Sequence, residues 1–292
     1  MSVQRPEALD QRIVLRDGRR LGFAEWGDPA GTPVFFFHGM PSSRLNGHAD
    51  QSVLDRHRVR WIAVDRPGMG LSDFQPRRRL LDWPDDVVQL ADGLGLDRFS
   101  VVGNSAGGPY AAACAYKIPV RLDRAGIVSG VAPFDRLPAE EQRMRETFAD
   151  RRAPWLGRAK LAGMAAAARR WPGWTYGQAI KSMPEADRIL ASRPSVRDAL
   201  LEAFLESVRS GTRGVDHEMR LHARPWGFQP EEITIGVDLW HGDQDASVPL
   251  AHAQLLADAI PVSRLTVHPG AGHLLIDACF EEIVSVLVPV DS

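Results

Sequence analysis

A five-residue segment at positions 103–107, Gly-Asn-Ser-Ala-Gly, constrains the fold of this 292-residue chain more than any other. The apolar residues 99–102 come directly before it, and a stretch rich in small residues, 109–115, follows it. A serine with glycine two positions before and two positions after, between a strand and a helix, is typical of a nucleophile elbow. The turn is so sharp that a Cβ at either glycine would collide with the strand or the helix. We therefore expect Ser105 to stand clear of a sheet, with the Ala106 N–H in the first helical turn, where it can hold an oxyanion.

Apolar strands and helical stretches alternate along most of the chain. After a hairpin predicted around Asp17-Gly18, the apolar runs lie at 34–37, 60–64, 99–102, 125–128, 235–240 and 265–267. Helices are predicted at 43–56, 84–94, 109–117, 249–259 and 274–286. Short, continuously apolar strands between helices indicate an α/β fold whose parallel sheet is covered on both faces. Because such strands end at one edge of the sheet, we expect the loops after them to form a common rim where ligands bind.

Residues 133–225 break this alternation, since they contain several helical stretches and no convincing strand. A capping-box pattern at residues 195–198 predicts a helix that runs to Gly211. The aromatic residues of this insertion, Trp155, Trp171 and Trp174 among them, either pack within it or roof an apolar substrate pocket. Arg143 or Arg145 pointing into such a pocket would indicate an anionic substrate. We predict a core of residues 1–132 and 226–292 and a helical cap of residues 133–225.

Composition excludes several classes of partner. The net charge of −2 gives no bulk electrostatic support for binding nucleic acid, and no apolar run is long enough for a membrane span.

The only two cysteines, Cys114 and Cys279, fall in apolar helical stretches, so we expect buried free thiols. The scarcity of cysteine and the lack of an apolar N-terminal segment favour a cytoplasmic location.

A serine hydroxyl needs a neighbouring base to act as a nucleophile. Among nine histidines, only His273 completes the order serine, acid, histidine that follows such an elbow. It ends a glycine-containing loop, 269–273, whose flexibility can return the imidazole to the rim. His38 and His241 end strands and are expected to hydrogen-bond loop backbone, and His268 is interpreted as structural. The other histidines are interpreted as surface or cap residues: His48, His57, His217, His222 and His252.

The base in turn needs a carboxylate that holds its tautomer and stabilises the imidazolium. The loop 241–249 offers two candidates. Asp245 lies further into the loop and is the preferred acid, whereas Asp243 is better placed to pin the turn through its side chain. Asp135, which follows the preceding strand, is the alternative. No metal or cofactor is expected, because no group of His, Asp and Glu has the ligand spacing of a helix or hairpin.

A second oxyanion donor is predicted at the end of the first core strand. The segment 38–41, His-Gly-Met-Pro, turns beside the elbow. Gly39 permits an unusual backbone angle and Pro41 stiffens the exit. The Met40 N–H is therefore the second candidate donor beside that of Ala106. Because the donor belongs to the main chain, the Met40 side chain should matter much less.

Five motifs in this order resemble those of the α/β-hydrolase family: HGMP at 38–41, DRPGMGLS at 65–72, GNSAG at 103–107, GDQD at 242–245 and GAGH at 270–273. The resemblance covers the chain outside residues 133–225. It implies a mostly parallel eight-stranded sheet with flanking helices and a helical cap inserted after the sixth strand. It also implies Ser105 as nucleophile, Asp245 as acid and His273 as base.

Departures from the family's patterns narrow the expected activity. Serine rather than aspartate at position 105 disfavours the dehalogenase and epoxide-hydrolase branches. Asn104 and Ala106 stand where proline iminopeptidases carry a tryptophan beside the serine, which disfavours aminopeptidase activity. The single glycine before Met40 resembles the simpler of the family's two oxyanion loops, whose members often handle esters of primary or secondary alcohols. The cap matches no specific branch.

The sequence therefore favours a cofactor-free serine hydrolase with a small-molecule substrate. A carboxylesterase acting on a small or medium apolar acyl ester, through an acyl-enzyme on Ser105, is the leading hypothesis. The same triad would also serve a C–C bond hydrolase, a thioesterase or a perhydrolase. A third hypothesis is a ligand-binding protein that uses the pocket as a receptor without turnover; an activated nucleophile argues against it.

Overall fold

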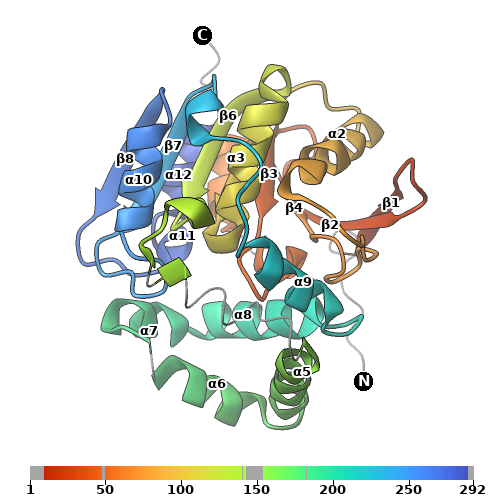
Figure 1. Cartoon of the computed structure of the whole chain (residues 1–292), viewed down its shortest axis with the longest axis vertical. Helices are drawn as coiled ribbons and strands as arrows, with labels where there is room; N and C mark the ends of the chain where they lie inside the picture. Colours follow the sequence, from red (N-terminus) through yellow and green to blue (C-terminus); the bar gives the residue numbers. More distant parts are fainter. Residues whose placement is uncertain (1–9, 48–49, 140, 143–153, 182, 289–292) are drawn as a thin grey trace.

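Eight strands form one sheet at the centre of the molecule (Figure 1). The computed structural model describes residues 10–47, 50–139, 141–142, 154–181 and 183–288. The strands are β1 Gln11–Val14, β2 Arg20–Gly27, β3 Thr32–Phe37, β4 Val59–Val64, β5 Phe99–Asn104, β6 Leu122–Val128, β7 Val237–Gly242 and β8 Ser263–His268. Their order across the sheet is β1-β2-β4-β3-β5-β6-β7-β8. Only the β1–β2 and β2–β4 pairs are antiparallel, which confirms the mostly parallel eight-stranded sheet.

The central strands are continuously apolar because both faces of the sheet are covered. Phe35 and Phe37 of β3 belong to one core, which also contains residues of α2 Trp83–Gly93, α3 Gly108–Lys117 and α10 Ala251–Ala259. Val34 and Phe36 of the same strand point to the other core, shared with α1 Gln51–His57 and α12 Phe280–Leu287. This alternation between two buried faces is why β3 lacks the polar positions of a half-exposed strand.

The elbow has the backbone that its glycines predicted. Ser105 follows β5 with φ of 55°, in the left-handed region that a non-glycine residue rarely adopts. A Cβ at Gly103 would overlap the Gly107 carbonyl, and a Cβ at Gly107 would overlap the Phe37 carbonyl of β3. The steric expectation for both positions is therefore confirmed, and the turn leads into α3.

Two of the predicted helices are interrupted. In place of a helix at 43–56 there is a 3-10 turn, Arg44–Gly47, and then α1. Helix α1 begins anew because the Asp50 carboxylate caps it by accepting the Ser52 N–H at 2.9 Å. In place of a helix at 274–286 there are α11 Leu275–Ala278 and α12, separated at Cys279, whose backbone leaves the helical region.

The insertion after β6 is helical, as predicted, and we call its helices α5 to α9 the cap. They are α5 Pro154–Arg170, α6 Pro172–Lys181, α7 Glu185–Ala191, α8 Pro194–Ser207 and α9 Arg213–Leu221. In Figure 1 they lie together along one end of the sheet. Within the described residues, no helix is both long and apolar enough to span a bilayer. The boundaries of a separate cap subdomain at 133 and 225 stay a prediction.

Details of the cap differ from the sequence prediction. Helix α8 begins at Pro194, after Arg193, without the capping-box contact predicted at 195–198, and it ends at Ser207 rather than Gly211. Proline at the first helical position supplies the start, and Gly211, with φ of 99°, turns the chain toward α9.

The side chains of the three named tryptophans are largely exposed, although Arg170 lies over the Trp171 ring, so the described residues do not show them as the roof of a pocket. Trp155, Trp171 and Trp174 are 55–66% exposed. His48, Arg143 and Arg145 lie outside the described residues. Cys114 is a buried free thiol, as predicted, whereas Cys279 is only half-buried.

Replacing Gly107 by alanine tests the steric account of the elbow. The new Cβ meets the backbone carbonyl of a central strand, which cannot move aside, so we expect a loss of stability of about 1–3 kcal/mol or more. Gly163 is the matched control, because it lies exposed within α5 with open space around its Cα. Gly163→Ala should leave stability unchanged or raise it by up to about 1 kcal/mol. Urea unfolding of both variants measures the difference; equal stabilities would refute the account.

Candidate active site

The structure brings Ser105, Asp245 and His273 together at the rim of the sheet. Ser105 follows β5, Asp245 lies in the loop after β7, and His273 lies in the loop after β8. His273 Nε2 is 3.0 Å from Ser105 Oγ, and His273 Nδ1 is 2.7 Å from Asp245 Oδ2. This geometry can transfer a proton from the serine hydroxyl to the imidazole while the carboxylate fixes the ring's tautomer. The roles that the sequence assigned to these residues stay predictions.

The Asp245 carboxylate is buried and well bonded. Its Oδ1 accepts the N–H groups of Ser247 and Val248, both at 2.8 Å. Burial would raise its pKa, but the hydrogen bond and charge of His273, together with the Val248 N–H, hold the pKa of Asp245 below its ordinary value. The acid therefore stays ionised at neutral pH, as an orienting carboxylate requires.

The two other candidate carboxylates have different surroundings. Asp243 accepts the Gly270 N–H at 2.7 Å, so it ties the loop after β7 to the start of the loop that carries His273. This matches the turn-pinning role expected for it. Asp135 is exposed on the 3-10 turn Phe134–Arg136, and no hydrogen bond joins it to His273 in the described part of the chain.

Two histidines that end strands bind loop backbone, as predicted. His38 is fully buried, with Nδ1 2.8 Å from the Gly39 carbonyl oxygen. His241 is also buried, with Nε2 2.8 Å from the Val248 carbonyl oxygen. Burial lowers the pKa of both imidazoles, that of His38 well below its ordinary value. Both therefore act as neutral supports of the rim.

His252 is not a surface or cap residue, contrary to the sequence interpretation. Its side chain is 2% exposed on the inner side of α10. Its Nδ1 accepts the Ala132 N–H at 3.0 Å, and its Nε2 lies 3.0 Å from a Glu141 carboxylate oxygen. His252 thus supports the chain where it leaves β6. Its local sequence, on a helix flanked by alanines, carried no sign of this.

The predicted oxyanion loop, residues 38–41, passes beside the serine. A Cβ at Gly39 would lie only 3.4 Å from the Ser105 Cβ, so the Met40 peptide follows at the elbow. Ala106 is buried in the 3-10 turn that opens at Ser105. Ala106 thus follows the serine directly, and Gly39, which precedes the other predicted donor residue, lies against it.

Arg66 holds the oxyanion loop from behind. Its guanidinium donates to the carbonyl oxygens of His38 and, at 2.9 Å, of Gly39. The Gly39 carbonyl and the Met40 N–H belong to one planar peptide. The orientation of the predicted donor is therefore fixed through Arg66. The sequence located Arg66 within a motif but gave no indication of this contact.

A buried cap carboxylate completes this support. Glu218 of α9 is 0% exposed; its Oε1 lies 2.8 Å from Arg66 Nε, and its Oε2 pairs with Arg78. Arg78 also donates to the Tyr110 hydroxyl at 2.7 Å. Burial opposes ionisation, but the two guanidinium groups hold the pKa of Glu218 well below its ordinary value. A charged contact thus connects the cap to the oxyanion loop.

Two further buried cap carboxylates bind the core. Glu206 of α8 lies 2.8 Å from Arg44, which pairs at 2.9 Å with Asp65. Asp187 of α7 accepts the Leu274 N–H at 2.8 Å, directly beside His273 in the chain. Asp187, Glu206 and Glu218 are all less than 7% exposed. Sequence analysis missed them, because acidic residues on helices are usually exposed.

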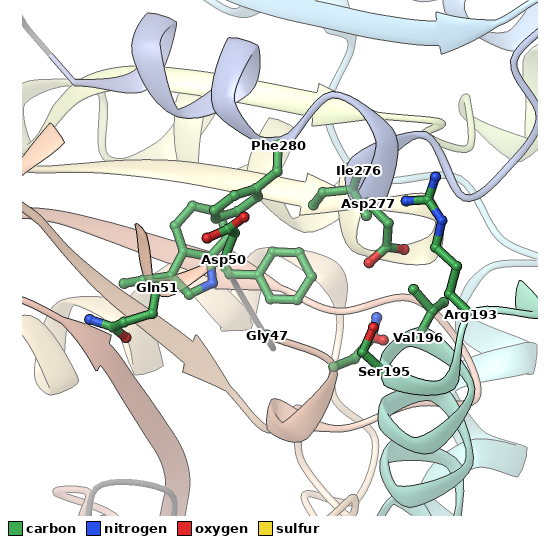
Figure 2. A pocket seen from close by; sticks show the side chains of 12 residues that line it. Gly47, Asp50, Gln51, Arg193, Ser195, Val196, Ile276, Asp277 and Phe280 are labelled. Carbon is green, nitrogen blue, oxygen red and sulfur yellow. The ribbon is translucent and has the colours of Figure 1, made fainter. Parts of the chain in front are cut away.

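Apolar side chains also fill the junction between cap and core. Met69 of the core packs with Ala165, Val208 and Val215 of the cap region, and Met40 lies against this cluster. The cavity in Figure 2 has a volume of about 420 Å³ and is lined by the start of α8, by α11 and by residues near the start of α1. Its lining does not include the residues of the proposed triad. Ser105 itself is half-buried.

Replacing Glu218 by glutamine tests the buried contact. Two buried guanidinium groups would lose their common counter-charge, so we expect a loss of about 3–5 kcal/mol in the free energy of unfolding. Asp216→Asn, in the same helix, is the control: Asp216 pairs with Arg158 and Arg220 near the surface. That change should cost less than about 1 kcal/mol. Urea unfolding compares the two; similar losses would show that burial of the Glu218 contact contributes nothing.

Comparisons with known proteins agree with the fold. Residues 34–286 match the profile of the alpha/beta hydrolase family. A proline iminopeptidase from Xylella fastidiosa is 28% identical over 89% of each chain. A 2-hydroxymuconate semialdehyde hydrolase from Pseudomonas putida is 25% identical over 90% of this chain and 87% of its own. The structure of a hydrolase from Pseudomonas aeruginosa PA01 superposes with a TM-score of 0.72 at 19% identity, covering 96% of this chain and 98% of that one. This chain is therefore a hydrolase and belongs to the alpha/beta hydrolase family.

Proposed function

We propose that this protein is a cofactor-free serine hydrolase, a carboxylesterase that acts on a small or medium apolar acyl ester. One observation carries the proposal: the His273 imidazole lies within hydrogen-bonding distance of both Ser105 Oγ, at 3.0 Å, and Asp245 Oδ2, at 2.7 Å. A nucleophile, a base and an orienting acid in this geometry form the arrangement used for acyl transfer.

In this proposal the reaction runs in two halves. Ser105 Oγ attacks the ester carbonyl while His273 Nε2 takes its proton. The N–H groups of Met40 and Ala106 bind the oxyanion. His273 then gives the proton to the leaving alcohol, and an acyl-enzyme remains on Ser105. Water, deprotonated by His273, hydrolyses that ester by the same route, and Asp245 stabilises the imidazolium in both halves.

The surroundings of the oxyanion loop support an apolar acyl group. The Met40 side chain packs against the apolar cluster that contains Met69 of the core, and Phe204 and Met219 of the cap pack against the same cluster. A substrate whose carbonyl is held at Met40 would therefore meet hydrocarbon and thioether groups. An acyl chain gains free energy there by leaving water, by about 0.8 kcal/mol for each buried methylene group.

C–C bond hydrolysis is the second candidate reaction for the same triad. Thioester cleavage and perhydrolysis are further alternatives that rank below it. The Pseudomonas putida relative, named a semialdehyde hydrolase, matches nearly the whole chain. The Xylella fastidiosa relative is named an iminopeptidase, but Asn104 and Ala106 replace the tryptophan expected beside the serine in that group. All of these activities would use Ser105 as the nucleophile. Ester, thioester and C–C hydrolysis differ in the leaving group, whereas perhydrolysis differs in the acyl acceptor, which is hydrogen peroxide in place of water.

A panel of chromogenic acyl esters of rising chain length tests the proposal. Ser105→Ala should lower kcat on the best ester by roughly 10⁴–10⁶-fold, because the nucleophile is lost. Ser129→Ala is the matched control, since Ser129 is another serine with a positive φ, 48°, and is buried at the end of a neighbouring strand. It should turn over esters like the parent.

The outcomes separate the hypotheses. Equal turnover by the parent and Ser105→Ala would refute the assignment of the nucleophile. Faster turnover of a β-diketone, an acyl thioester or a prolyl anilide than of any ester would replace the carboxylesterase proposal with the corresponding activity. Failure of a fluorophosphonate probe to label Ser105, together with tight ligand binding, would favour the receptor hypothesis.

A further inference from the structure

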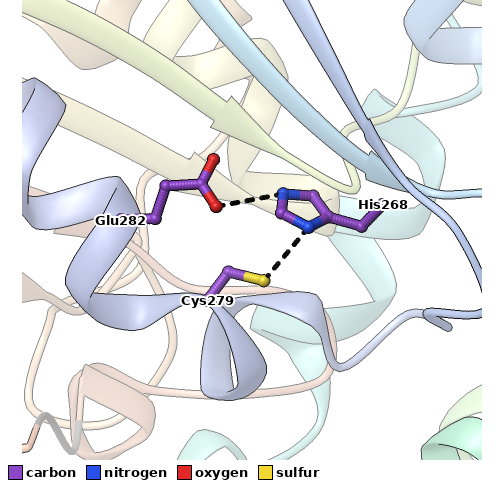
Figure 3. Close-up of side chains that lie close together, drawn as sticks. All are labelled: His268, Cys279 and Glu282. Atoms are coloured by element: carbon purple, nitrogen blue, oxygen red, sulfur yellow. Dashed lines mark hydrogen bonds and ion pairs between the residues drawn. The ribbon is translucent and has the colours of Figure 1, made fainter.

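Three side chains of types that bind metals lie together at the two ends of the loop that carries His273. His268 is the last residue of β8, Cys279 separates α11 from α12, and Glu282 lies in the first turn of α12 (Figure 3). Cys279 Sγ is 3.4 Å from His268 Nδ1, and Glu282 Oε2 is 3.4 Å from His268 Nε2. Each residue offers one ligand atom within 4.8 Å of the other two.

We propose that His268, Cys279 and Glu282 bind one Zn²⁺ ion, with water in the fourth position. Thiolate, imidazole and carboxylate are the three side-chain ligands that zinc accepts, and the thiolate disfavours Mg²⁺ and Ca²⁺. In a tetrahedral zinc shell the sulfur and nitrogen ligands lie roughly 3.5 Å apart, given bond lengths of about 2.3 and 2.0 Å. The observed Sγ–Nδ1 separation of 3.4 Å matches this without any movement of the backbone.

The Glu282 carboxylate, the third proposed ligand, is oriented by a hydrogen bond from Trp240. Trp240, 2% exposed, donates from Nε1 to Glu282 Oε1 at 3.0 Å. The other carboxylate oxygen is thereby left for His268 or a metal ion, in the manner of supporting contacts around metal ligands. The Glu282 side chain is 43% exposed and that of His268 20%. An ion can therefore enter from solvent. Glu282 Oε2 contacts the other ring nitrogen, Nε2, so this carboxylate would give up that contact to bind an ion held at Nδ1.

Zinc would act on the loop between its ligands. Residues 269–278 carry His273, and the ion would join the end of β8 to the start of α12 across this loop. On binding, the Cys279 thiol releases its proton to solvent and the thiolate bonds to zinc. We expect the ion to stabilise the folded chain, because the unfolded chain lacks the preformed site. No metal was expected from the sequence, where only groups of His, Asp and Glu were considered, whereas the proposed site includes a cysteine.

Titration of the full chain with Co²⁺ tests the proposal without reference to activity. Cobalt substitutes for zinc, and a thiolate ligand produces a sulfur-to-metal charge-transfer band in the near ultraviolet. One equivalent should produce the band, and Zn²⁺ should remove it by displacement. Cys279→Ser should abolish the band. His268→Gln and Glu282→Gln should weaken binding by more than the roughly 10–100-fold that loss of a supporting contact costs.

Two control variants locate the site. Cys114→Ala removes the other, fully buried thiol and should keep the band. His273→Ala removes the proposed base and should also keep it. Zn²⁺ should raise the thermal midpoint of the parent and of both controls, but not that of Cys279→Ser, with circular dichroism confirming that each variant folds. No band at excess Co²⁺, or a band that survives in Cys279→Ser, would overturn the proposal.

A separate observation concerns Asp187 of the cap. Its side chain is 2% exposed, and its Oδ1 accepts the Leu274 N–H at 2.8 Å. A Cβ at Gly272 would overlap this carboxylate, so Asp187 packs against the backbone on both sides of His273. We infer, on the basis of the proposed function, that Asp187 is a positioning residue that keeps the imidazole in line with Ser105.

Two substitutions at Asp187 separate positioning from packing. Asparagine keeps an oxygen acceptor of the same size, so Asp187→Asn should retain kcat to within a few-fold. Asp187→Ala should lower kcat by on the order of 10–100-fold with KM little changed, because a displacement of about 1 Å at the reacting groups has that effect. Asp198→Ala, at an exposed cap aspartate, is the control.

Urea unfolding shows whether each variant remains folded under assay conditions. If the parent hydrolyses esters and Asp187→Ala does so with the parent's kcat, the positioning role is refuted while the proposed function stands. Equal losses in Asp187→Ala and Asp187→Asn would also refute it, since the acceptor oxygen would then be irrelevant. If the parent hydrolyses no ester, the proposed function fails instead.

Discussion

The contact between the Ser105 hydroxyl and the His273 imidazole is the constraint on which the rest of the structure depends. It joins two residues 168 positions apart at 3.0 Å. One side is fixed by steric exclusion, since Gly103 and Gly107 alone let the chain turn so sharply between β5 and α3. The other side is fixed by hydrogen bonds, since Asp245 holds the imidazole and Asp243 holds the start of its loop. Steric exclusion on one side and hydrogen bonds on the other thus fix the distance between Ser105 Oγ and His273 Nε2.

The cap contributes to the same rim through buried charge. Glu218 reaches the oxyanion loop through Arg66, and Asp187 reaches the loop that carries His273. Buried ion pairs add little net stability, because desolvating the charges costs about as much as their attraction returns. Their main effect is to fix the position of the cap relative to the core, because a displaced cap would leave buried charges unpaired. The cap therefore reaches both the predicted oxyanion donor and the predicted base.

The fold and the candidate site residues could be predicted from the sequence wherever they depend on a short local pattern of residues. The glycines around Ser105 and the polar loops after apolar strands are visible in a single sequence, so the mostly parallel sheet and the meeting of Ser105, Asp245 and His273 could be anticipated. Contacts set by tertiary packing could not. Asp187 and Glu218 resemble exposed helical acids, and His252 resembles a surface histidine until α10 packs against the strand. The cap tryptophans were expected to pack within the cap or to roof a pocket, but they are largely exposed, because aromatic composition alone does not determine which side chains become buried.

The central claim is that Ser105 becomes acylated during turnover. Rapid quenching of the reaction with an excess of a slowly deacylating ester, followed by digestion and mass spectrometry of the peptides, tests it most directly. The account predicts a mass increase equal to the acyl group on the peptide that contains Ser105, localised to that side chain. Turnover with an unmodified Ser105, or with the acyl group on another residue, would contradict it.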